Sequence, residues 1–582
     1  MENKLLRRVE DISLKEAVWK LKNKTRALAS VNDDYYNECV AFALLLEMKN
    51  PDKDATSLKD FLEELQIETE ISQFILKTIE NDWDVIRTFK KDFNYEELLA
   101  CLLFGDEEDY FKGRTSGLSV TPRSLSALAL RILEIESDNK VLDLCSGQGN
   151  FLMHAMAANE NAEYHGIEIN ANTYRIAKMK SLIAPGKVSF SFGDALNVKT
   201  QEKYDKIFSH YPYKMFVPEY VFEQGVLLDI FGDVVKRVRK SSSDWLFNLS
   251  MISLLSDSGK GISVMIPASI TSGSDKKIRK YFIDNGFIEA VISLPAGLEP
   301  STSISLNFVV FSHGNKDVTF IDAKDIYKKT GVRKSAVLTE ENIAEIVTLL
   351  RNGGDKAVRV SNEKIAETEY NLNPVRYLDP IYEIDIKNAV AFETVIKSVN
   401  RGAQISPDFL DEYMSPHETD IQYVPLGSIR NNVFEPDDMP QYLKEVPEKM
   451  DNFIIKNNML LITRAGNAIK TAVATVEENK IYIGSGNLLL VELDETKINP
   501  YYLQAFFMSD IGSAVLNSNA SSNGALMTLQ LPQLKALPIP LIPLEEQKEI
   551  ADKCLAANKE YVYYKAKLAA AQDRMNRIYE GD

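Results

Sequence analysis

The stretch from residue 116 to 325 alternates short apolar runs, rich in β-branched and aromatic residues, with longer segments of helical periodicity. Each run is long enough for one buried strand, and strands that alternate with helices build a parallel sheet wrapped by helices. The runs are Val141–Leu144, Val188–Phe192, Lys206–Phe208, Ile262–Ile266, Ala290–Leu294 and Leu306–Phe311. The sequence therefore predicts an α/β domain over residues 116–325.

The rest of the 582-residue chain divides by texture into four further segments. Residues 1–115 carry helical periodicity and predict an all-helical domain. Residues 326–389 are a charged, partly helical connector, and residues 390–543 contain short strands broken by Gly, Asn and Pro, which predicts a separate α+β domain. Residues 544–582 have no Pro or Gly before Gly581 and predict one long terminal helix.

The first chemical signal is the run Val141-Leu-Asp-Leu-Cys-Ser-Gly-Gln-Gly-Asn-Phe-Leu152, in which a strand enters a Gly-x-Gly turn and then a helix. Such a turn brings backbone close to a nucleotide-like ligand, because glycine has no β-carbon in the way. Leu152 replaces the third glycine of a dinucleotide fingerprint, which counts against NAD or FAD. Two later strands end in Glu168 and Asp194, whose carboxylates suit ribose hydroxyls and an adenine amino group; alternatively, both are helix N-caps.

Asp143–Leu152 resembles the S-adenosylmethionine loop of the N6-adenine DNA methylases, the modification subunits of type I restriction-modification systems. Other segments that match these subunits are Gly117–Pro122, Ser243–Phe247, Ser258–Pro267, Lys277–Lys280 and Ala290–Pro295. The resemblance implies a Rossmann-like methyltransferase fold with S-adenosylmethionine as the cofactor. The residues that it assigns to the cofactor site are Thr121, Pro122, Asp143, Cys145, Gly147, Gly149, Phe151, Glu168 and Asp194.

The catalytic tetrapeptide of this family, Asn-Pro-Pro-Tyr, is replaced here by His210-Tyr211-Pro212-Tyr213. In the family the adenine is flipped out of the duplex. The Asn oxygen and a proline carbonyl then accept hydrogen bonds from its amino group, while the Tyr ring stacks on the base. The resemblance therefore places His210, Pro212 and Tyr213 at the catalytic site. A neutral imidazole offers one acceptor nitrogen, and a protonated imidazole offers none.

This substitution leaves two functions open. In the first, the chain is a site-specific adenine-N6 DNA methyltransferase with His210 as a substitute acceptor. In the second, it is a weak or inactive homologue that serves as a DNA-recognition or assembly subunit of a restriction-modification or defence system. The retained acids and glycines of the cofactor loop favour the first. Methylation of another acceptor, such as a cytosine amino group, is a minor third hypothesis.

The C-terminal part resembles one target-recognition domain and one spacer helix of a type I specificity subunit. The matching segments are Gln422–Ile429, Asn458–Gly466, Asn499–Leu503 and Leu537–Ile550. In such domains, loops read base edges and basic side chains position the DNA backbone, so Arg464 is expected to contact double-stranded DNA. The terminal helix either pairs two copies of the chain or packs on its own domain. Separate restriction or specificity subunits are further expected partners.

The net charge of −17 argues against a surface coated for phosphate binding, but basic residues are locally concentrated. One group holds Lys236, Arg237, Arg239 and Lys240, and a second runs from Lys276 to Lys280. We predict that the first group contacts DNA; the alternative for each group is a solvated helix face.

The four cysteines contain no Cys-x-x-Cys pair and do not combine with the five histidines at metal-ligand spacing, so neither a metal nor a disulfide framework is expected. No signal peptide and no apolar stretch of about 18 residues is present. The sequence therefore predicts a cytoplasmic, nucleoid-associated protein without a membrane segment.

Overall fold

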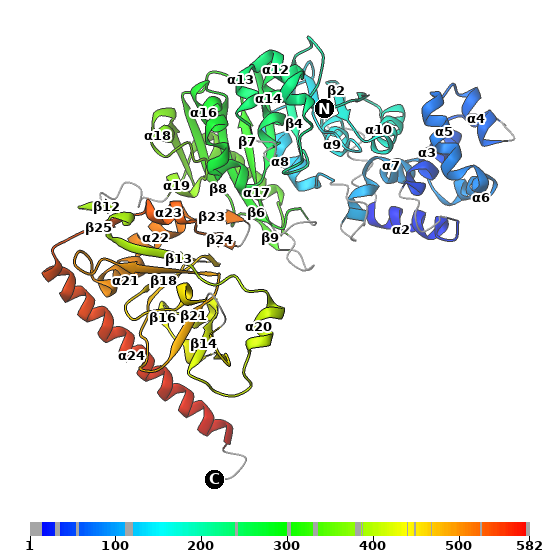
Figure 1. The fold of residues 1–582 in the computed structure, drawn as a ribbon. Coiled ribbons are helices and arrows are strands. Elements are labelled where there is room, and N and C mark those ends of the chain that lie inside the picture. The colour runs from blue at the N-terminus through cyan, green and yellow to red at the C-terminus, as the bar shows by residue number, and fades with distance from the viewer. Residues whose placement is uncertain are drawn as a thin grey trace. The chain divides into compact units, whose positions relative to one another are not determined.

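The computed structural model describes residues 14–28, 35–53, 57–110, 120–238, 243–299, 304–329, 336–378, 386, 388–438, 440–446, 450–466, 468–523 and 526–577. The chain divides into two compact units, Met1–Leu378 and Asp379–Asp582 (Figure 1). The expected boundary at 115/116 and residues Gly117–Ser119 of the matching segment Gly117–Pro122 lie outside the described residues.

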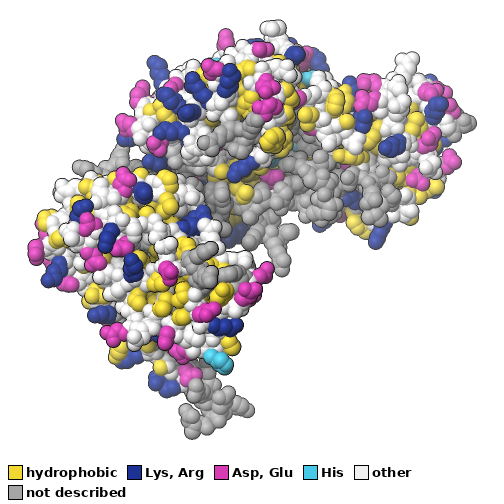
Figure 2. Space-filling model, in the orientation of Figure 1, with side chains coloured by type: hydrophobic (Ala, Val, Ile, Leu, Met, Phe, Trp, Pro, Cys, Tyr) yellow, Lys and Arg dark blue, Asp and Glu magenta, His cyan; other side chains and the backbone are white. Residues whose placement is uncertain are grey.

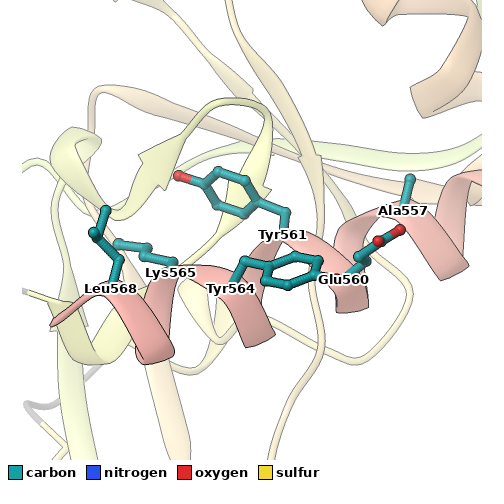
Figure 3. Close-up of a pocket in the computed structure, with 6 residues that line it drawn as sticks. All are labelled: Ala557, Glu560, Tyr561, Tyr564, Lys565 and Leu568. Atoms are coloured by element: carbon teal, nitrogen blue, oxygen red, sulfur yellow. The ribbon is translucent and has the colours of Figure 1, made fainter. Parts of the chain in front are cut away.

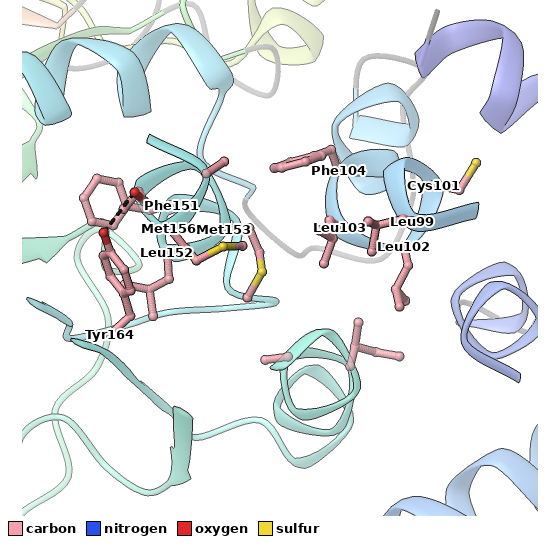
Figure 4. Close-up of a cluster of buried hydrophobic side chains, with 14 of the residues drawn as sticks. Leu99, Cys101, Leu102, Leu103, Phe104, Phe151, Leu152, Met153, Met156 and Tyr164 are labelled. Atoms are coloured by element: carbon pink, nitrogen blue, oxygen red, sulfur yellow. Dashed lines mark hydrogen bonds between the residues drawn. The ribbon is translucent and has the colours of Figure 1, made fainter. Parts of the chain in front are cut away.

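The first unit opens with helices, as the periodicity of this region predicts. Their bounds are α2 (Leu14–Thr25), α3 (Tyr36–Lys49), α4 (Leu58–Glu64), α5 (Thr69–Ile79), α6 (Trp83–Arg87) and α7 (Tyr95–Tyr110). These helices share a core with the region that follows: Leu103 and Phe104 of α7 point toward Met153 and Met156 (Figure 4). The Phe104 ring also stacks on His154, with ring centroids 4.8 Å apart. The helical segment is thus packed against the sheet region by a continuous apolar core.

In the described part of the first unit, β9 (Lys328–Lys329) and β10 (Ala336–Val337) form a two-stranded sheet, and the other strands form one sheet in the order β11-β8-β6-β7-β5-β4-β1-β2-β3. Their bounds are β1 (Lys140–Asp143), β2 (Glu163–Glu168), β3 (Lys187–Phe192), β4 (Tyr204–Ser209), β5 (Leu255–Met265), β6 (Ile288–Ala296), β7 (Ser305–Phe311), β8 (Asp317–Asp322) and β11 (Ala357–Ser361). Each apolar run of the sequence falls within or overlaps one of these strands.

The sheet is mixed, which corrects the expectation of a parallel sheet. Strands β1 to β5 are parallel to their neighbours among themselves, but β7 runs antiparallel to both β5 and β6, and β11 runs antiparallel to β8. Strand β7 runs antiparallel to β6 because the link between them is short. Parallel neighbours need a crossover of a dozen or more residues, and residues 297–304 are too few to make one.

Alternation along the strands separates two apolar faces. Val141 packs into one core with α8 (Arg123–Leu133), α9 (Asn150–Ala158) and α10 (Ala171–Ile183). Its neighbour Leu142 packs into a second core with α14 (Asp244–Leu254) and α16 (Lys276–Asp284). Successive strand residues point to opposite faces, so one short apolar run is buried by helices on both sides. This arrangement leaves the carboxyl ends of the strands as an edge where loops gather.

The segment expected to be a connector, residues 326–389, instead contributes mainly to the first unit. Strand β11 extends the sheet by pairing with β8, and α17 (Glu340–Asn352) covers the same core as α8. The Leu372 amide donates to the Ile270 carbonyl at 3.1 Å. The charged texture of this segment reflects the solvated sides of these elements, while Ile343 and Ile346 are buried.

The second unit has an α+β architecture. A four-stranded sheet has the order β13 (Ile396–Arg401), β22 (Leu488–Leu493), β18 (Leu460–Thr463) and β20 (Thr471–Val473). A smaller sheet has the order β17 (Gln441–Tyr442), β14 (Ile421–Val424) and β21 (Ile481–Gly484). Helices α21 (Pro500–Met508) and α22 (Asp510–Asn519) follow, and α24 (Leu544–Arg577) ends the described chain.

Candidate active site

Three carboxylates lie at adjacent positions on one edge of the sheet. Asp143 ends β1 and Glu168 ends β2, while Asp194 follows the end of β3. Strand β2 pairs in parallel with both β1 and β3, so the three ends are neighbours. Strand β4 lies on the other side of β1, where the direction of chain progression reverses. Ligands of open α/β sheets bind at such a reversal, beyond the carboxyl ends of the strands.

The turn after β1 depends on two glycines with different surroundings. Gly147 has φ +54° and its amide donates to Glu168 Oε2 at 2.9 Å. A β-carbon at Gly147 would meet no atom within 4 Å, so this side of the turn is open. Gly149 has φ +83°, and a β-carbon there would lie 2.5 Å from Cζ of Phe190. Gly147 therefore faces the space available to a ligand, whereas Gly149 allows the turn to pack on the sheet.

Asp143 is buried, and burial raises the pKa of its carboxyl to about 8, with a further contribution from the charge of Glu168. Its Oδ1 accepts a hydrogen bond of 3.3 Å from the Cys145 amide. The Cys145 thiol lies beside it, and burial raises the pKa of this thiol well above its usual range. A buried carboxyl with a raised pKa gains most from a cationic partner.

Glu168 and Asp194 provide further acceptors beside exposed apolar side chains. Glu168 also accepts from the Asn170 amide at 2.6 Å, and burial raises the pKa of its carboxyl. Asp194 accepts from the Leu196 amide at 2.8 Å and from the Tyr220 hydroxyl. Next to these acids, Ile169 is 64% exposed and Phe192 is 59% exposed. Carboxylates flanked by exposed apolar side chains fit a ligand with ribose hydroxyls and a flat base.

These features fit S-adenosylmethionine at the residues expected from the sequence, with one correction. The open side of Gly147 leaves a cradle that a β-carbon would fill, and the three acids match the polar groups of the cofactor. Phe151, however, does not reach this edge: its ring is buried and stacks on Phe208, with centroids 4.1 Å apart. The position after the Gly-x-Gly turn lies in the first turn of α9, on the side that faces the sheet.

The target motif, His210 to Tyr213, follows the end of β4, the strand next to β1 and its terminal acid Asp143. The imidazole of His210 is held on both nitrogens: Nδ1 lies 3.1 Å from Thr121 Oγ1, and Nε2 lies 2.8 Å from the Tyr213 hydroxyl. Burial lowers the pKa of His210, and the Glu299 carboxylate opposes this shift. His210 is therefore neutral near pH 7. Thr121 therefore holds the target motif from the segment Gly117–Pro122. Pro122 is buried as the N-cap of α8.

The other residues of the motif divide between core and surface. Tyr211 is buried, and its ring stacks on Phe247 of α14 at 4.8 Å with an interplanar angle of 10°. Pro212 is exposed and Tyr213 is half-buried. Tyr211 therefore replaces the first proline by a side chain that fixes the motif to the core.

The basic groups differ in exposure. Figure 2 shows Lys and Arg side chains gathered over the region of α13 (Asp233–Lys236) and α16. Arg237 is exposed, and Lys236 is exposed and pairs with Asp233 at 3.2 Å. Arg239 and Lys240 lie outside the described residues. In the second group Arg279 is buried rather than solvated: its Nε donates to the Tyr370 carbonyl, and Nη1 to the Ser272 carbonyl, each at 2.6 Å.

In the second unit, Arg464 follows β18 and is half-buried. Its amide donates to the Asn487 carbonyl at 2.8 Å, while Arg401 Nε donates to the neighbouring Gly486 carbonyl at 2.7 Å. Partial burial and the charge of Arg464 lower the pKa of Arg401. A hollow of about 330 Å³ opens beside Arg401, and no acid lines it. Its lining residues are Arg401, Ala403, Gln404, Ile405, Ser406, Tyr423, Gly486 and Asn487.

The terminal helix α24 packs on its own domain. The Tyr561 hydroxyl accepts from Asn431 at 2.8 Å, and Lys565 pairs with Glu435 at 2.8 Å. A hollow of about 510 Å³ also lies along this helix, lined by Ala557, Glu560, Tyr561, Tyr564, Lys565 and Leu568 (Figure 3). Tyr564 and Leu568 are exposed, as are Val562, Tyr563 and Met575. One side of the helix thus packs on its domain while apolar residues remain on its surface.

Two site residues were missed by the sequence analysis. Glu299 contacts the target motif from the loop after β6, and Arg401 lies beside Arg464. Neither belongs to a motif, and only the tertiary pairing brings them to these positions. Among the described residues, no group of three or more His, Cys, Asp or Glu is placed to hold a metal ion, and no helix there is long and apolar enough to span a bilayer.

The Rossmann-like mixed sheet, with a Gly-x-Gly turn and ordered acids at one edge, defines the class: a nucleotide-cofactor methyltransferase fold. The model of the N-6 DNA Methylase family matches residues 107–385, and that of the Type I restriction modification DNA specificity domain matches residues 417–554. The chain thus joins a region that matches the N-6 DNA methylases to a region that matches the specificity domain of type I restriction-modification systems. The family and the fold class expected from the sequence are confirmed.

Individual relatives agree. The chain is 26% identical over 407 residues to the type I restriction enzyme MpnII methylase subunit of Mycoplasma pneumoniae, an alignment that covers 59% of this chain and 74% of that subunit. It is 24% identical over 436 residues to the MjaIX methylase subunit of Methanocaldococcus jannaschii, covering 68% and 75%. A type I methyltransferase subunit from Streptococcus thermophilus shares the fold, with a TM-score of 0.50, 19% identity, and coverage of 63% of this chain and 99% of that chain. The chain is thus similar to the methylase subunits of type I restriction enzymes.

Proposed function

We propose that this chain binds S-adenosylmethionine at the β1–β3 edge and methylates an adenine that is held at His210 to Tyr213. The observation that carries the proposal is the parallel pairing of β1 with β4, with Asp143 opposite Phe208. Because of this pairing, the cofactor turn and the target motif leave neighbouring strands at the same edge. Methyl transfer to a weakly nucleophilic amine needs mainly such positioning, since reacting atoms must be brought within about 3–3.5 Å.

The chemistry of the three acids supports an assignment of each to one part of the cofactor. The buried Asp143 carboxyl suits the ammonium group of the amino-acid end. Glu168, fixed by the Gly147 and Asn170 amides, suits the ribose hydroxyls. Asp194, beside the exposed Phe192 ring, suits the adenine amino group. When bound there, S-adenosylmethionine supplies an electrophilic methyl group. The protein's own part is to bind, orient and exclude water.

DNA recognition is assigned to the second unit, with Arg464 and Arg401 as backbone contacts. The charge of Arg464 contributes to the lowered pKa of Arg401, so an anion that contacts both guanidinium groups would stabilise them, and a DNA phosphate is such an anion. Each lost phosphate contact reduces the salt dependence of binding by about 0.9 in the slope of log K against log salt. Arg401→Gln and Arg464→Gln are therefore expected to weaken binding to all sequences alike. A change in the preferred sequence instead would assign them to base readout.

The terminal helix is proposed to join a second copy of the chain. The support is the hollow along α24 and the exposed Tyr564, Leu568 and Met575, which remain uncovered by the helix's own domain. Leu568→Glu is expected to convert a dimer to a monomer in light scattering. A wild-type monomer at micromolar concentration would contradict this assignment and favour separate subunits as partners.

Expression in cells free of DNA methylation, followed by sequencing for modified bases, tests the enzymatic proposal. A recurrent N6-methyladenine motif is expected with the wild type and should be absent with Tyr213→Ala. DNA binding without any modified base would contradict the proposal and favour the second candidate, a recognition subunit. The observation behind this second candidate is that both His210 nitrogens are already engaged within the protein.

A further inference from the structure

Glu299 brings an acid into the target motif from a distant part of the sequence. It follows β6, and its side chain is 4% exposed, as is that of His210. Its Oε2 lies 3.8 Å from His210 Nε2 and 3.5 Å from the Tyr213 hydroxyl. The same oxygen therefore lies beside both members of the motif that the family uses to hold a base.

This contact determines which His210 nitrogen carries the proton. A neutral imidazole has one N–H and one acceptor nitrogen. The Glu299 carboxylate lies on the Nε2 side, which favours the proton on Nε2, and Nδ1 then accepts from the Thr121 hydroxyl at 3.1 Å. In this tautomer Nε2 cannot accept a hydrogen bond from an amino group. His210 alone is thus a poor replacement for an asparagine oxygen on the side that faces Tyr213.

A carboxylate can take over this role. It has two oxygens with about four lone-pair sites, so Glu299 can accept from Tyr213 or His210 and from a further donor. Hydrogen bonds to a charged acceptor are also about twice as strong as neutral ones. Resting on the methyltransferase function proposed above, we propose that Glu299 is a catalytic residue that accepts a hydrogen bond from the amino group of the target adenine. His210, which Thr121 holds at Nδ1, positions Glu299.

The inference can be tested by equilibrium binding of the full chain to DNA. The recognised sequence is first selected from a random duplex pool, which does not require methylation. Binding is then compared between that duplex and one whose target adenine is replaced by purine, which lacks the amino group. Because each protein meets the same two duplexes, the ratio of their Kd values removes the cost of opening the base pair. In Glu299→Ala, the preference for adenine over purine is expected to fall by about tenfold or more relative to wild type.

Two variants separate this role from a structural one. Glu299→Gln keeps an acceptor oxygen and should retain part of the preference for adenine. Glu289→Ala removes another acid of β6, which binds Lys260 and Ser312 at 2.8 Å, and should leave the preference unchanged. An unchanged preference in both Glu299 variants would overturn the inference. DNA binding with the expected preference but no methylation would instead contradict the proposed function alone, and a chain that selects no duplex would overturn both.

Discussion

The cofactor edge and the target motif lie on neighbouring strands, yet they are built in different ways. At the cofactor edge, Asp143, Glu168 and Asp194 follow successive strands, and each is positioned by local backbone amides. In the target motif, His210 is positioned by side chains from distant segments, Thr121 and Glu299. A site made from strand ends tolerates little change, whereas one made from converging side chains can exchange its acceptor for another.

Removal of the Tyr211 ring is expected to have the largest effect on stability. Tyr211→Ala deletes a buried ring that stacks on Phe247, and such deletions cost about 3–5 kcal/mol. Denaturant unfolding followed by tryptophan fluorescence measures this, because Trp19, Trp83 and Trp245 all lie in the first unit. Tyr211→Phe keeps the ring and serves as the control. A cost of less than about 1 kcal/mol would show that the motif is not anchored to the core.

The two glycines of the cofactor turn are expected to separate stability from binding. In Gly149→Ala the new β-carbon meets the Phe190 ring, and overpacking together with the positive φ should cost about 2–4 kcal/mol. In Gly147→Ala only the positive φ is unfavourable, at about 1–2 kcal/mol. Its methyl group, however, enters the space assigned to the cofactor, so calorimetry should show greatly weakened binding of S-adenosylmethionine. Unchanged binding by Gly147→Ala would place the ligand elsewhere.

The smallest expected effect is a proton linked to cofactor binding at Asp143. With a pKa of about 8, its carboxyl is mostly protonated at pH 7, and a bound ammonium group favours the ionised form. Binding should therefore release up to one proton, and affinity should rise by up to about tenfold from pH 6 to 7. Without ligand, the folded state disfavours the ionised form of Asp143. The contribution of Asp143 to the free energy of unfolding therefore falls as pH rises from about 4 to about 8.

Calorimetry in buffers of different ionisation enthalpy measures this proton, and Asp143→Asn should abolish both its release and the pH dependence. Equal heats in all buffers for the wild type would contradict a buried, protonated Asp143.

The sequence identifies the parts of the molecule that depend on local chain order. Short apolar runs locate the strands, and the acids after them locate Glu168 and Asp194, because parallel strands end at the same edge. The predicted direction of β7 was wrong, because the length of the link after β6 determines that direction and the apolar run does not. Phe151 was misplaced because the pattern does not say which side of α9 faces the sheet.

Tertiary contacts account for what the sequence did not predict. Glu299 is about ninety residues from His210, and only the pairing of β6 and β7 beside β5 brings its loop to the target motif. Arg279 belongs to a basic run, yet it is buried and donates hydrogen bonds to the carbonyls of Ser272 and Tyr370. A charge pattern does not distinguish a solvated guanidinium group from one that holds distant loops together.

The rate of methyl transfer by His210→Asn tests most directly whether His210 and Glu299 together replace the asparagine of the family motif. This variant restores the first residue of the family motif but removes the imidazole that joins Thr121 to Tyr213 and Glu299. The measurement is a single-turnover reaction on the selected duplex, with saturating S-adenosylmethionine. A fall of about tenfold or more is expected, equivalent to at least about 1.4 kcal/mol of lost transition-state stabilisation. A rate that rises above that of the wild type would contradict the account and show that His210 is a defective replacement for asparagine.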